Sequence, residues 1–216
     1  MTPIRVGLLG LGTVGRGTYQ VLRRNQPEIA RRAGRSIEIA AIAVRDVAKA
    51  RAIVGPDVPI SANCEDIVGD PDIDIVVEVI GGYEPARSLA LEAIARGKHV
   101  VTANKAMLAR HGNELFDAAR SKGVMLAFEA AVAGGIPIIK ALREGLTANR
   151  IEWIAGIING TSNFILSEMR SQGLTFDAAL KEAQRLGYAE ADPTFDVEGI
   201  DAAQKLAILS SIAFGV

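Results

Sequence analysis

Three glycines follow directly on a short apolar run near the start of the chain, and this arrangement leaves few folds open to it. The run IRVGLL at 4–9 fits a buried parallel strand, and a helical stretch begins soon after it. Gly10, Gly12 and Gly15 stand between the two with G-x-G-x-x-G spacing. The first glycine permits a tight turn, the second a close approach of backbone to a pyrophosphate, and the third close packing of helix on strand. The spacing alone is weak evidence, but between a strand and a helix it predicts a dinucleotide-binding loop.

Strand-like and helix-like segments alternate along the first 135 residues. Helices are expected from about Val14 to Ala33, over 86–97 and over 106–123, and strands over 36–44, 71–82, 98–103 and 124–130. This alternation is typical of βαβ units. It predicts an α/β fold with a Rossmann-type parallel sheet, in an NAD(P)-binding domain at 1–135.

The rhythm changes after about residue 135. Helices are expected over 136–146, 161–173, 175–187 and 200–213, a strand over 150–159, a turn and helix cap at NGTSN (159–163), and a polar loop over 188–199. We predict an incomplete α+β domain at 136–216. It looks incomplete because the last helix is apolar and has no polar closing segment, which indicates a truncated chain or a partner that covers the helix.

Composition and charge narrow the classes of partner. Of the 216 residues 49% are hydrophobic, and the net charge is −1, which is typical of a soluble globular protein and unfavourable for binding nucleic acid or an anionic membrane. The arginines between 23 and 35 form a basic cluster, but Glu28 interrupts it, so a solvated helix face is the simpler interpretation. The single cysteine, Cys64, excludes an internal disulfide. With no leader or membrane-spanning segment, a cytoplasmic protein is expected.

The end of the second expected strand bears on the choice of dinucleotide. An NAD-binding protein usually has an acidic residue there for the ribose hydroxyls, but here Arg45 comes first and Asp46 second. A guanidinium suits a 2′-phosphate, so we favour NADP; Asp46 leaves NAD open, and Arg45 pointing to solvent is the alternative. The backbone N–H groups of Thr13 and Val14, at the helix start, are expected to face the phosphates.

Several motifs, in order and at suitable separations, resemble the homoserine dehydrogenase family. They are GLGTVG at 10–15, TANKA at 102–106, EAAVAGGIPI at 129–138, GIINGTSNFIL at 156–166 and GYAEADPTFDVEGIDAAQKLAIL at 187–209. The resemblance implies NAD(P)-dependent interconversion of L-homoserine and L-aspartate 4-semialdehyde, on the way to threonine and methionine, by a homodimer. It also implies that 136–216 is part of a substrate-binding, catalytic and dimerisation domain that continues beyond residue 216 and is often followed by a regulatory domain.

The implied reaction needs a proton donor for the aldehyde oxygen. His99 and His111 fall within an expected strand and an expected helix and are more simply structural, so lysine is the alternative donor. Lys105 follows a strand at its carboxyl end, where ligands of open α/β sheets bind. Lys205 comes four residues after Asp201, which places both on one helix face that continues as an apolar stripe. A helix-surface ion pair is the competing interpretation.

The resemblance also implies roles for individual residues. The position of Lys205 is the family's proton donor, and the positions of Asp201 and Glu190 bind substrate, with Glu190 suited to its ammonium group. The position of Lys105 contacts both cofactor and substrate. Gly187 matches a glycine that contacts the cofactor, although a helix C-cap explains it as well.

The same resemblance implies a sodium site. In the family its ligands are main-chain carbonyls and nearby oxygens, at positions that match Glu129, Val132, Gly134 and Ile136. A hard cation with oxygen ligands suits a tight glycine turn with one acid. From the residues alone, a simple turn into the helix after Pro137 is preferred.

Besides the enzyme that the resemblance implies, two other functions fit the glycine loop: a non-catalytic binding module, and a different NADP-dependent enzyme that shares the nucleotide-binding domain. A non-catalytic NAD(P)-binding or sensing module would keep the loop without needing Lys105, Glu190, Asp201 and Lys205 together. The motifs after residue 135 favour the enzyme, because nucleotide-binding loops recur widely whereas the 187–209 stretch does not.

Overall fold

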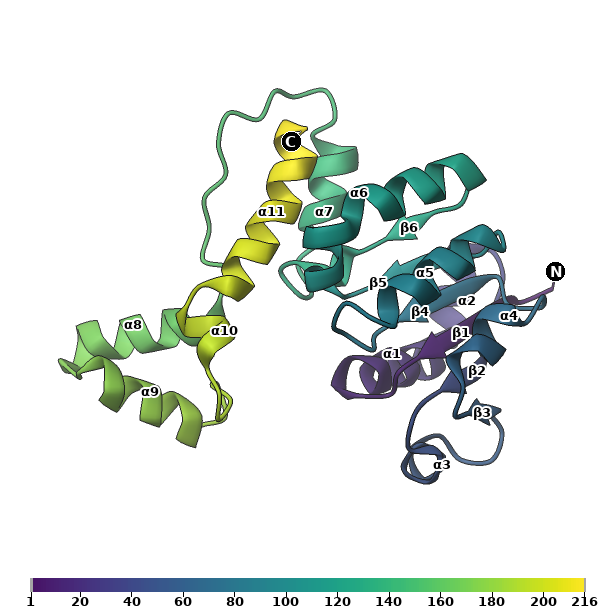
Figure 1. Cartoon of the computed structure of the whole chain (residues 1–216), viewed down its shortest axis with the longest axis horizontal. Coiled ribbons are helices and arrows are strands. Elements are labelled where there is room, and N and C mark those ends of the chain that lie inside the picture. The colour runs from purple at the N-terminus through teal and green to yellow at the C-terminus, as the bar shows by residue number, and fades with distance from the viewer. Residues whose placement is uncertain (1, 216) are drawn as a thin grey trace. The chain divides into compact units, whose positions relative to one another are not determined.

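The computed structural model describes residues 2–215 and divides the chain into two compact units. Unit 1 is Met1–Ala131 and unit 2 is Val132–Val216. The division lies close to the domain boundary predicted after residue 135. Figure 1 draws the elements of both units.

A parallel sheet with the strand order β3-β2-β1-β4-β5-β6 forms the centre of unit 1 (Figure 1). Its strands are β1 (Ile4–Leu9), β2 (Ile37–Ala43), β3 (Ile60–Ser61), β4 (Ile75–Glu78), β5 (His99–Thr102) and β6 (Leu126–Ala127). From β1 the chain adds β2 and β3 on one side of the sheet, and from β4 it adds β5 and β6 on the other side. The direction in which strands are added therefore reverses between β1 and β4. Such a switch point creates a crevice outside the carboxyl ends of the strands, where open α/β sheets bind ligands. The predicted Rossmann-type sheet is confirmed.

Helices cover both faces of this sheet. They are α1 (Thr13–Arg24), α2 (Gln26–Ala33), α3 (Val47–Val54), α4 (Cys64–Gly69), α5 (Ala86–Ala95) and α6 (Lys105–Lys122), followed by a short 3-10 turn, η1 (Glu129–Ala131). On one face Leu8 packs in a buried cluster with Tyr19 of α1 and Val54 of α3. On the other, a Cβ at Gly7 would lie 2.3 Å from Ile67 of α4. Because neighbouring residues of a strand point to opposite faces, β1 is buried from both sides.

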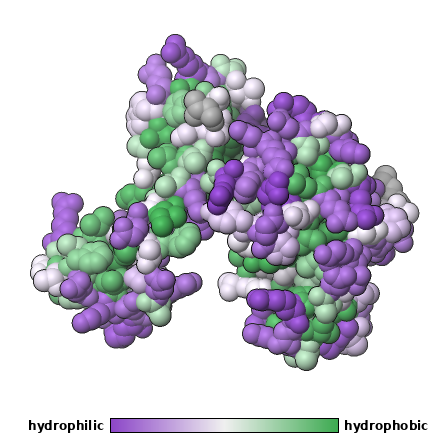
Figure 2. Space-filling model, viewed as in Figure 1, coloured by the Kyte–Doolittle hydropathy of each residue, from purple (hydrophilic) through white to green (hydrophobic). Residues whose placement is uncertain are grey.

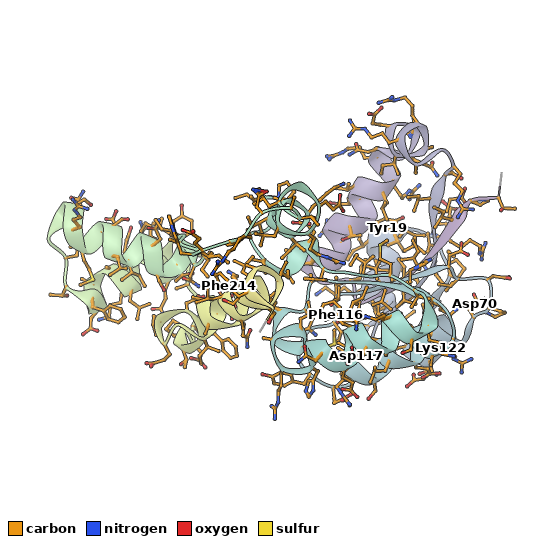
Figure 3. The ribbon with its side chains drawn as sticks, turned by 90° about the horizontal axis from the view of Figure 1, so that it is seen from above. Tyr19, Asp70, Phe116, Asp117, Lys122 and Phe214 are labelled. Carbon is orange, nitrogen blue, oxygen red and sulfur yellow. The ribbon has the colours of Figure 1, made fainter. Side chains whose placement is uncertain are left out.

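The Tyr19 side chain, labelled in Figure 3, satisfies its polar end inside this core. Its hydroxyl donates to the Val54 carbonyl at 3.0 Å and accepts from Arg23 Nη1 at 2.7 Å. A buried aromatic ring with a bonded hydroxyl adds apolar contact without leaving an unpaired polar group.

Unit 1 corrects several expectations about its elements. The helix expected from Val14 to Ala33 is two helices that meet at Asn25, because Pro27, in the first turn of α2, cannot continue the ladder of α1. The stretch 46–70, for which no element was predicted, holds α3, β3 and α4. The strand expected over 124–130 is short, and its last residues form η1.

Unit 2 is mostly helical. Its elements are α7 (Ile138–Lys140), a π-helical turn η2 (Ala141–Gly145), α8 (Gly160–Gln172), α9 (Phe176–Arg185), α10 (Thr194–Val197) and α11 (Ile200–Phe214). The expected helices over 161–173, 175–187 and 200–213 are confirmed as α8, α9 and α11, and α10 interrupts the expected loop. Ile165 packs in a small buried cluster with Ala179, Ala183 and Ala189.

The strand predicted over 150–159 is wrong. This segment has no regular structure, and within residues 2–215 no strand pairs with it. A strand exists only where a neighbour completes its hydrogen-bond ladder, so β-branched composition is not sufficient. Trp153 and Ile157 are 74% and 79% exposed. Apolar residues also reach the surface of the α8–α10 part of unit 2 in Figure 2.

None of the helices in the described part of the chain has both the length and the apolar character needed to cross a membrane.

Candidate functional site

The glycine loop of unit 1 joins β1 to α1. Its three glycines differ in how much room there is for a side chain. Gly10 has φ +98°, and a Cβ there would lie 2.9 Å from the Val79 carbonyl oxygen. A Cβ at Gly15 would lie 2.2 Å from the Gly10 carbonyl oxygen. At Gly12, the N-cap of α1, a Cβ would meet no described atom within 4 Å. Gly10 and Gly15 are therefore required by packing, whereas Gly12 faces open space.

That open space lies at the amino end of a helix. Thr13 and Val14 are the first residues of α1, and both are exposed. The first N–H groups of a helix have no acceptor within it, so they are available to an anion. The residues present thus fit a dinucleotide pyrophosphate: two glycines shape the turn and the third leaves room for the ligand.

The end of β2 presents the two residues that bear on the choice of dinucleotide. Asp46 is the N-cap of α3, and its Oδ1 accepts from the Lys49 N–H at 2.9 Å. Arg45 is exposed. The acidic residue therefore has a structural task that explains its presence, whereas no such task explains the exposed Arg45.

Lys105 is the first residue of α6, which begins just beyond the carboxyl end of β5. Its neighbour Asn104 is the N-cap of that helix, with Oδ1 accepting from the Met107 N–H at 3.1 Å. Lys105 is partly buried. The structure therefore places this lysine at the strand edge where the sequence predicted it.

In unit 2, Asp201 and Lys205 form an ion pair on α11 with Nζ–Oδ2 at 2.6 Å. Their side chains are 11% and 19% exposed, so the pair is largely withdrawn from water. Lys205 Nζ also donates to the Ile158 carbonyl at 2.7 Å. A lysine ammonium has three N–H donors, so these contacts hold its direction and leave one donor for another acceptor.

Asn159 completes this cluster. Its Nδ2 donates to Asp201 Oδ2 at 2.9 Å and to Asp196 Oδ1 at 2.7 Å, while its Oδ1 accepts from the Ser162 N–H at 2.7 Å. Asn159 is also the N-cap of α8, as the sequence predicted for this turn. One amide side chain therefore ties α8, the 188–199 stretch and α11 together around the carboxylate that holds Lys205.

Gly187 and Glu190 lie where α9 leads into the following loop. Gly187 has φ +78° and follows the C-cap residue Leu186, so the helix-ending role is confirmed. Thr161 Oγ1 donates to the Tyr188 carbonyl at 2.7 Å, which joins this loop to the first turn of α8. Glu190 is exposed, and its carbonyl accepts from Gln184 Nε2 at 3.1 Å.

Further along the same loop, Asp192 is held by one of its neighbours. The Thr194 hydroxyl, at 2.6 Å from Asp192 Oδ1, lowers the pKa of that carboxyl below its usual value. The Thr194 N–H donates to the same oxygen at 3.1 Å. The carboxylate thereby stabilises the turn that leads into α10.

The residues of the predicted sodium site lie on both sides of the division between the units. Glu129 begins η1 in unit 1. In unit 2, Val132 is fully buried, Gly134 has φ +57° and Ile136 is 64% exposed. Ala133 also has φ +57°, which is uncommon for a residue with a side chain. Within residues 2–215 there is no group of three or more His, Cys, Asp or Glu suited to a metal ion.

Residues 10–129 match the family model "Homoserine dehydrogenase, NAD binding domain", and residues 137–216 match the model "Homoserine dehydrogenase". The chain belongs to the homoserine dehydrogenase family.

Individual relatives support the same assignment. A homoserine dehydrogenase from Pseudomonas aeruginosa is 66% identical over 216 residues, which is the whole of this chain and 49% of that protein. The crystal structure of a homoserine dehydrogenase from Thiobacillus denitrificans has 72% identity and a TM-score of 0.96, covering 100% of this chain and 50% of that one. A hyperthermophilic archaeal homoserine dehydrogenase in complex with NADPH has 30% identity and a TM-score of 0.86, and this chain covers 71% of it. The chain spans about half the length of the curated relatives it matches.

The sequence did not reveal the buried contacts of two polar residues, Asn159 and Glu78. Asn159 was interpreted as part of a turn and helix cap, and nothing in its local sequence indicates a contact with Asp201, 42 residues away. Glu78 was included in a strand with no further role, although an acidic residue inside an otherwise apolar run is a signal of a special position.

Proposed function

We propose that the protein containing this chain catalyses NADP-dependent interconversion of L-homoserine and L-aspartate 4-semialdehyde, a step in threonine and methionine biosynthesis. The observation that carries the proposal is the arrangement of Lys205. Its ammonium group is held by Asp201 and the Ile158 carbonyl in one unit of a chain whose other unit has a dinucleotide loop. Membership of the homoserine dehydrogenase family supports this choice of reaction.

The nicotinamide cofactor, when bound, supplies the hydride that reduces the aldehyde. Lys205 would donate a proton to the carbonyl oxygen as negative charge develops there, and would accept one in the opposite direction. Asp201 would keep that ammonium in place and, with Glu190, bind the substrate. Lys105 would provide a second positive charge that stabilises the alkoxide-like transition state.

We propose that the preferred dinucleotide is NADP. Arg45 is exposed at the end of β2, where a guanidinium can pair with a 2′-phosphate, while Asp46 is occupied as a helix cap. Arg45→Ala should weaken NADP binding and leave NAD binding nearly unchanged, which titration of both dinucleotides would measure. Equal weakening of both would contradict the assignment.

Two finer features also belong to the proposal. A sodium ion would be bound at the turn containing Val132, Gly134 and Ile136, with Glu129 as the acidic residue. Thermal unfolding in NaCl and in choline chloride at equal ionic strength tests this. The protein would form a homodimer, which light scattering of the full-length protein tests.

The main test is homoserine-dependent reduction of NADP by the full-length protein. We expect turnover with homoserine and reversal with aspartate 4-semialdehyde. Cofactor binding without turnover of either compound would instead favour a non-catalytic NAD(P)-sensing module.

A further inference from the structure

A buried carboxyl group lies at the carboxyl end of β4, beside the nucleotide crevice of unit 1. Glu78 is the last residue of this strand and is 0% exposed. Its Oε1 accepts from the backbone N–H groups of Ile80 and Gly81 at 2.8 and 3.2 Å. Its Oε2 accepts from the Thr102 hydroxyl, at the end of β5, at 2.5 Å. Burial of a carboxyl group is unfavourable unless such partners compensate for lost water.

The hydrogen bonds continue from Thr102 to the start of α6. Thr102 Oγ1 accepts from the Asn104 N–H at 3.0 Å, and Asn104 Nδ2 donates to the Gly82 carbonyl at 2.6 Å. Asn104 Oδ1 caps α6 through the Met107 N–H. Three buried polar side chains therefore connect the turn 80–82, the ends of two strands and the first turn of the helix that carries Lys105.

The turn 80–82 lies directly against the glycine loop. A Cβ at Gly10 would lie 2.9 Å from the Val79 carbonyl oxygen and 3.3 Å from the Ile80 nitrogen. Gly81 and Gly82 have φ +83° and +74°, are exposed, and would meet no described atom within 4 Å of an added Cβ. The turn 80–82 therefore packs against the glycine loop on one side and leaves open space around Gly81 and Gly82.

The sheet order indicates which part of a dinucleotide faces this open space. In a sheet ordered 3-2-1-4-5-6, each half binds one mononucleotide across the switch point. In the β1–β3 half, Arg45 follows the carboxyl end of β2 and is the residue proposed to bind the adenosine 2′-phosphate. The β4–β6 half, which contains the Glu78 network, is left for the nicotinamide mononucleotide.

We infer that Glu78, Thr102 and Asn104 are positioning residues for the nicotinamide half of the cofactor. They hold the turn 80–82 and the backbone of Lys105 in the arrangement that receives this half, without having to contact it themselves. The inference rests on the proposed NADP-dependent function and adds to it the residues that shape the second half of the crevice.

The test compares a whole dinucleotide with a fragment that lacks the nicotinamide half. Two variants interrupt the network at different bonds in the full-length protein. Thr102→Val removes the hydroxyl at nearly constant shape, and Thr102→Ser is its matched control. Asn104→Asp keeps the oxygen that caps α6 but removes the donor to Gly82. Affinities for NADPH and for adenosine 2′,5′-bisphosphate are measured by calorimetry, together with melting temperatures.

We expect Thr102→Val and Asn104→Asp to weaken NADPH binding about tenfold, the effect of one well-placed hydrogen bond. Their affinity for adenosine 2′,5′-bisphosphate should stay within about twofold of the wild type, because that ligand contacts only the other half. Thr102→Ser should resemble the wild type for both ligands. Arg45→Ala should instead weaken the binding of both ligands, because both carry the 2′-phosphate.

Equal losses for both ligands would show a role in general stability only, and unchanged NADPH binding would show no role; either result overturns the inference. Absence of homoserine turnover in a wild-type protein that shows the expected binding pattern would contradict the proposed reaction alone. A wild-type protein that binds neither ligand would contradict both.

Discussion

Unit 1 and unit 2 bury apolar residues to very different extents. In unit 1 both faces of the sheet are covered by the unit's own helices, and residues such as Leu8, Ile42 and Val76 are completely buried. In unit 2 the buried cluster around α8 and α9 is one isoleucine and three alanines, and the other buried apolar residues are Val132, Ile139, Ile208 and Leu209. Its exposed large apolar residues are Ile136, Leu146, Trp153, Ile157, Leu166, Phe176, Leu186, Tyr188, Phe195, Ile200, Leu206 and Phe214.

The two units also present their chemistry differently. Unit 1 offers mainly backbone: a glycine loop, a helix start and a turn held by buried polar side chains. Unit 2 offers side chains, with the Lys205 ammonium held by a carboxylate and a carbonyl. An ion pair that is largely shielded from water can therefore be held by specific contacts even in a unit that exposes many apolar side chains. Each of the following predictions tests one side of this contrast.

The largest effect is expected for the ammonium group of unit 2. Lys205→Ala should lower the rate of homoserine oxidation about 10³-fold, because it removes the proposed proton donor and acceptor. NADPH binding should change little, since the dinucleotide loop belongs to unit 1. Steady-state kinetics and NADPH titration on the full-length protein measure both. Lys181→Ala, at an exposed lysine of α9, is the matched control and should retain full activity.

Adjacent residues of α8 test how much of unit 2 is packed. Ile165 is 1% exposed and Leu166 is 64% exposed. Ile165→Ala should lower the free energy of unfolding by about 3 kcal/mol, whereas Leu166→Ala should change it by less than about 0.5 kcal/mol. Urea denaturation of this chain gives both values. A large loss for Leu166→Ala would mean that another surface covers α8 in solution.

Substitutions at two glycines of the unit 1 loop distinguish a role in packing from a role in ligand binding. Gly15→Ala forces a Cβ toward the Gly10 carbonyl oxygen and should cost about 2 kcal/mol of folding stability. Gly12→Ala meets no described atom, so its cost should stay below about 1 kcal/mol, the range of a changed N-cap.

Gly12→Ala, the less destabilising of these two substitutions, should be the one that directly obstructs cofactor binding. The methyl group of Gly12→Ala would occupy the place of a phosphate and weaken NADPH binding at least about tenfold. Thermal melting and NADPH titration on both variants make the comparison. Equal destabilisation by the two substitutions would show that the loop has no open side.

The smallest effect concerns Cys64, the chain's only cysteine, which lies in α4 of unit 1. Burial, with a smaller contribution from the charge of Glu65, raises the pKa of its thiol. Because the thiolate is the nucleophile, alkylation of the native chain by iodoacetamide should be a few-fold slower than in urea, roughly in proportion to the thiolate fraction.

The raised pKa of the Cys64 thiol also determines how its contribution to stability changes with pH. The neutral thiol is favoured in the folded state, so its contribution to stability is present below the ordinary thiol pKa. It is lost as pH rises through the raised value. Native and unfolded alkylation rates should therefore converge at high pH. A native rate that equals the unfolded rate at neutral pH would mean that α4 opens readily. Cys64→Ser serves as the unlabelled control.

Much of unit 1 could be predicted from local sequence, and the failures have specific causes. The strand at 4–9 and the glycine loop were predictable because each depends on a few consecutive residues. Helix α3 and strand β3 were missed because each is short and its periodicity is weak. The break at Asn25 depends on Pro27, which favours the first turn of a new helix over the interior of an old one.

In unit 2 the helices were predictable but the strand was not. The segment 150–159 has the apolar and β-branched residues of a strand, yet β-structure depends on a partner that the segment itself does not contain. The Asp201–Lys205 pair was predictable because positions four apart on a helix must share a face.

Local sequence was thus enough for the glycine loop, the alternation of strands and helices, and the lysine–aspartate pair, since each arises within one turn or one element. Only the folded chain shows that Glu78 meets Thr102, 24 residues later, and that Asn159 meets Asp201, 42 residues later. The reason is physical. A buried polar group takes whichever partner the neighbouring elements bring within hydrogen-bond distance, and it is the packing of strands and helices that determines those neighbours.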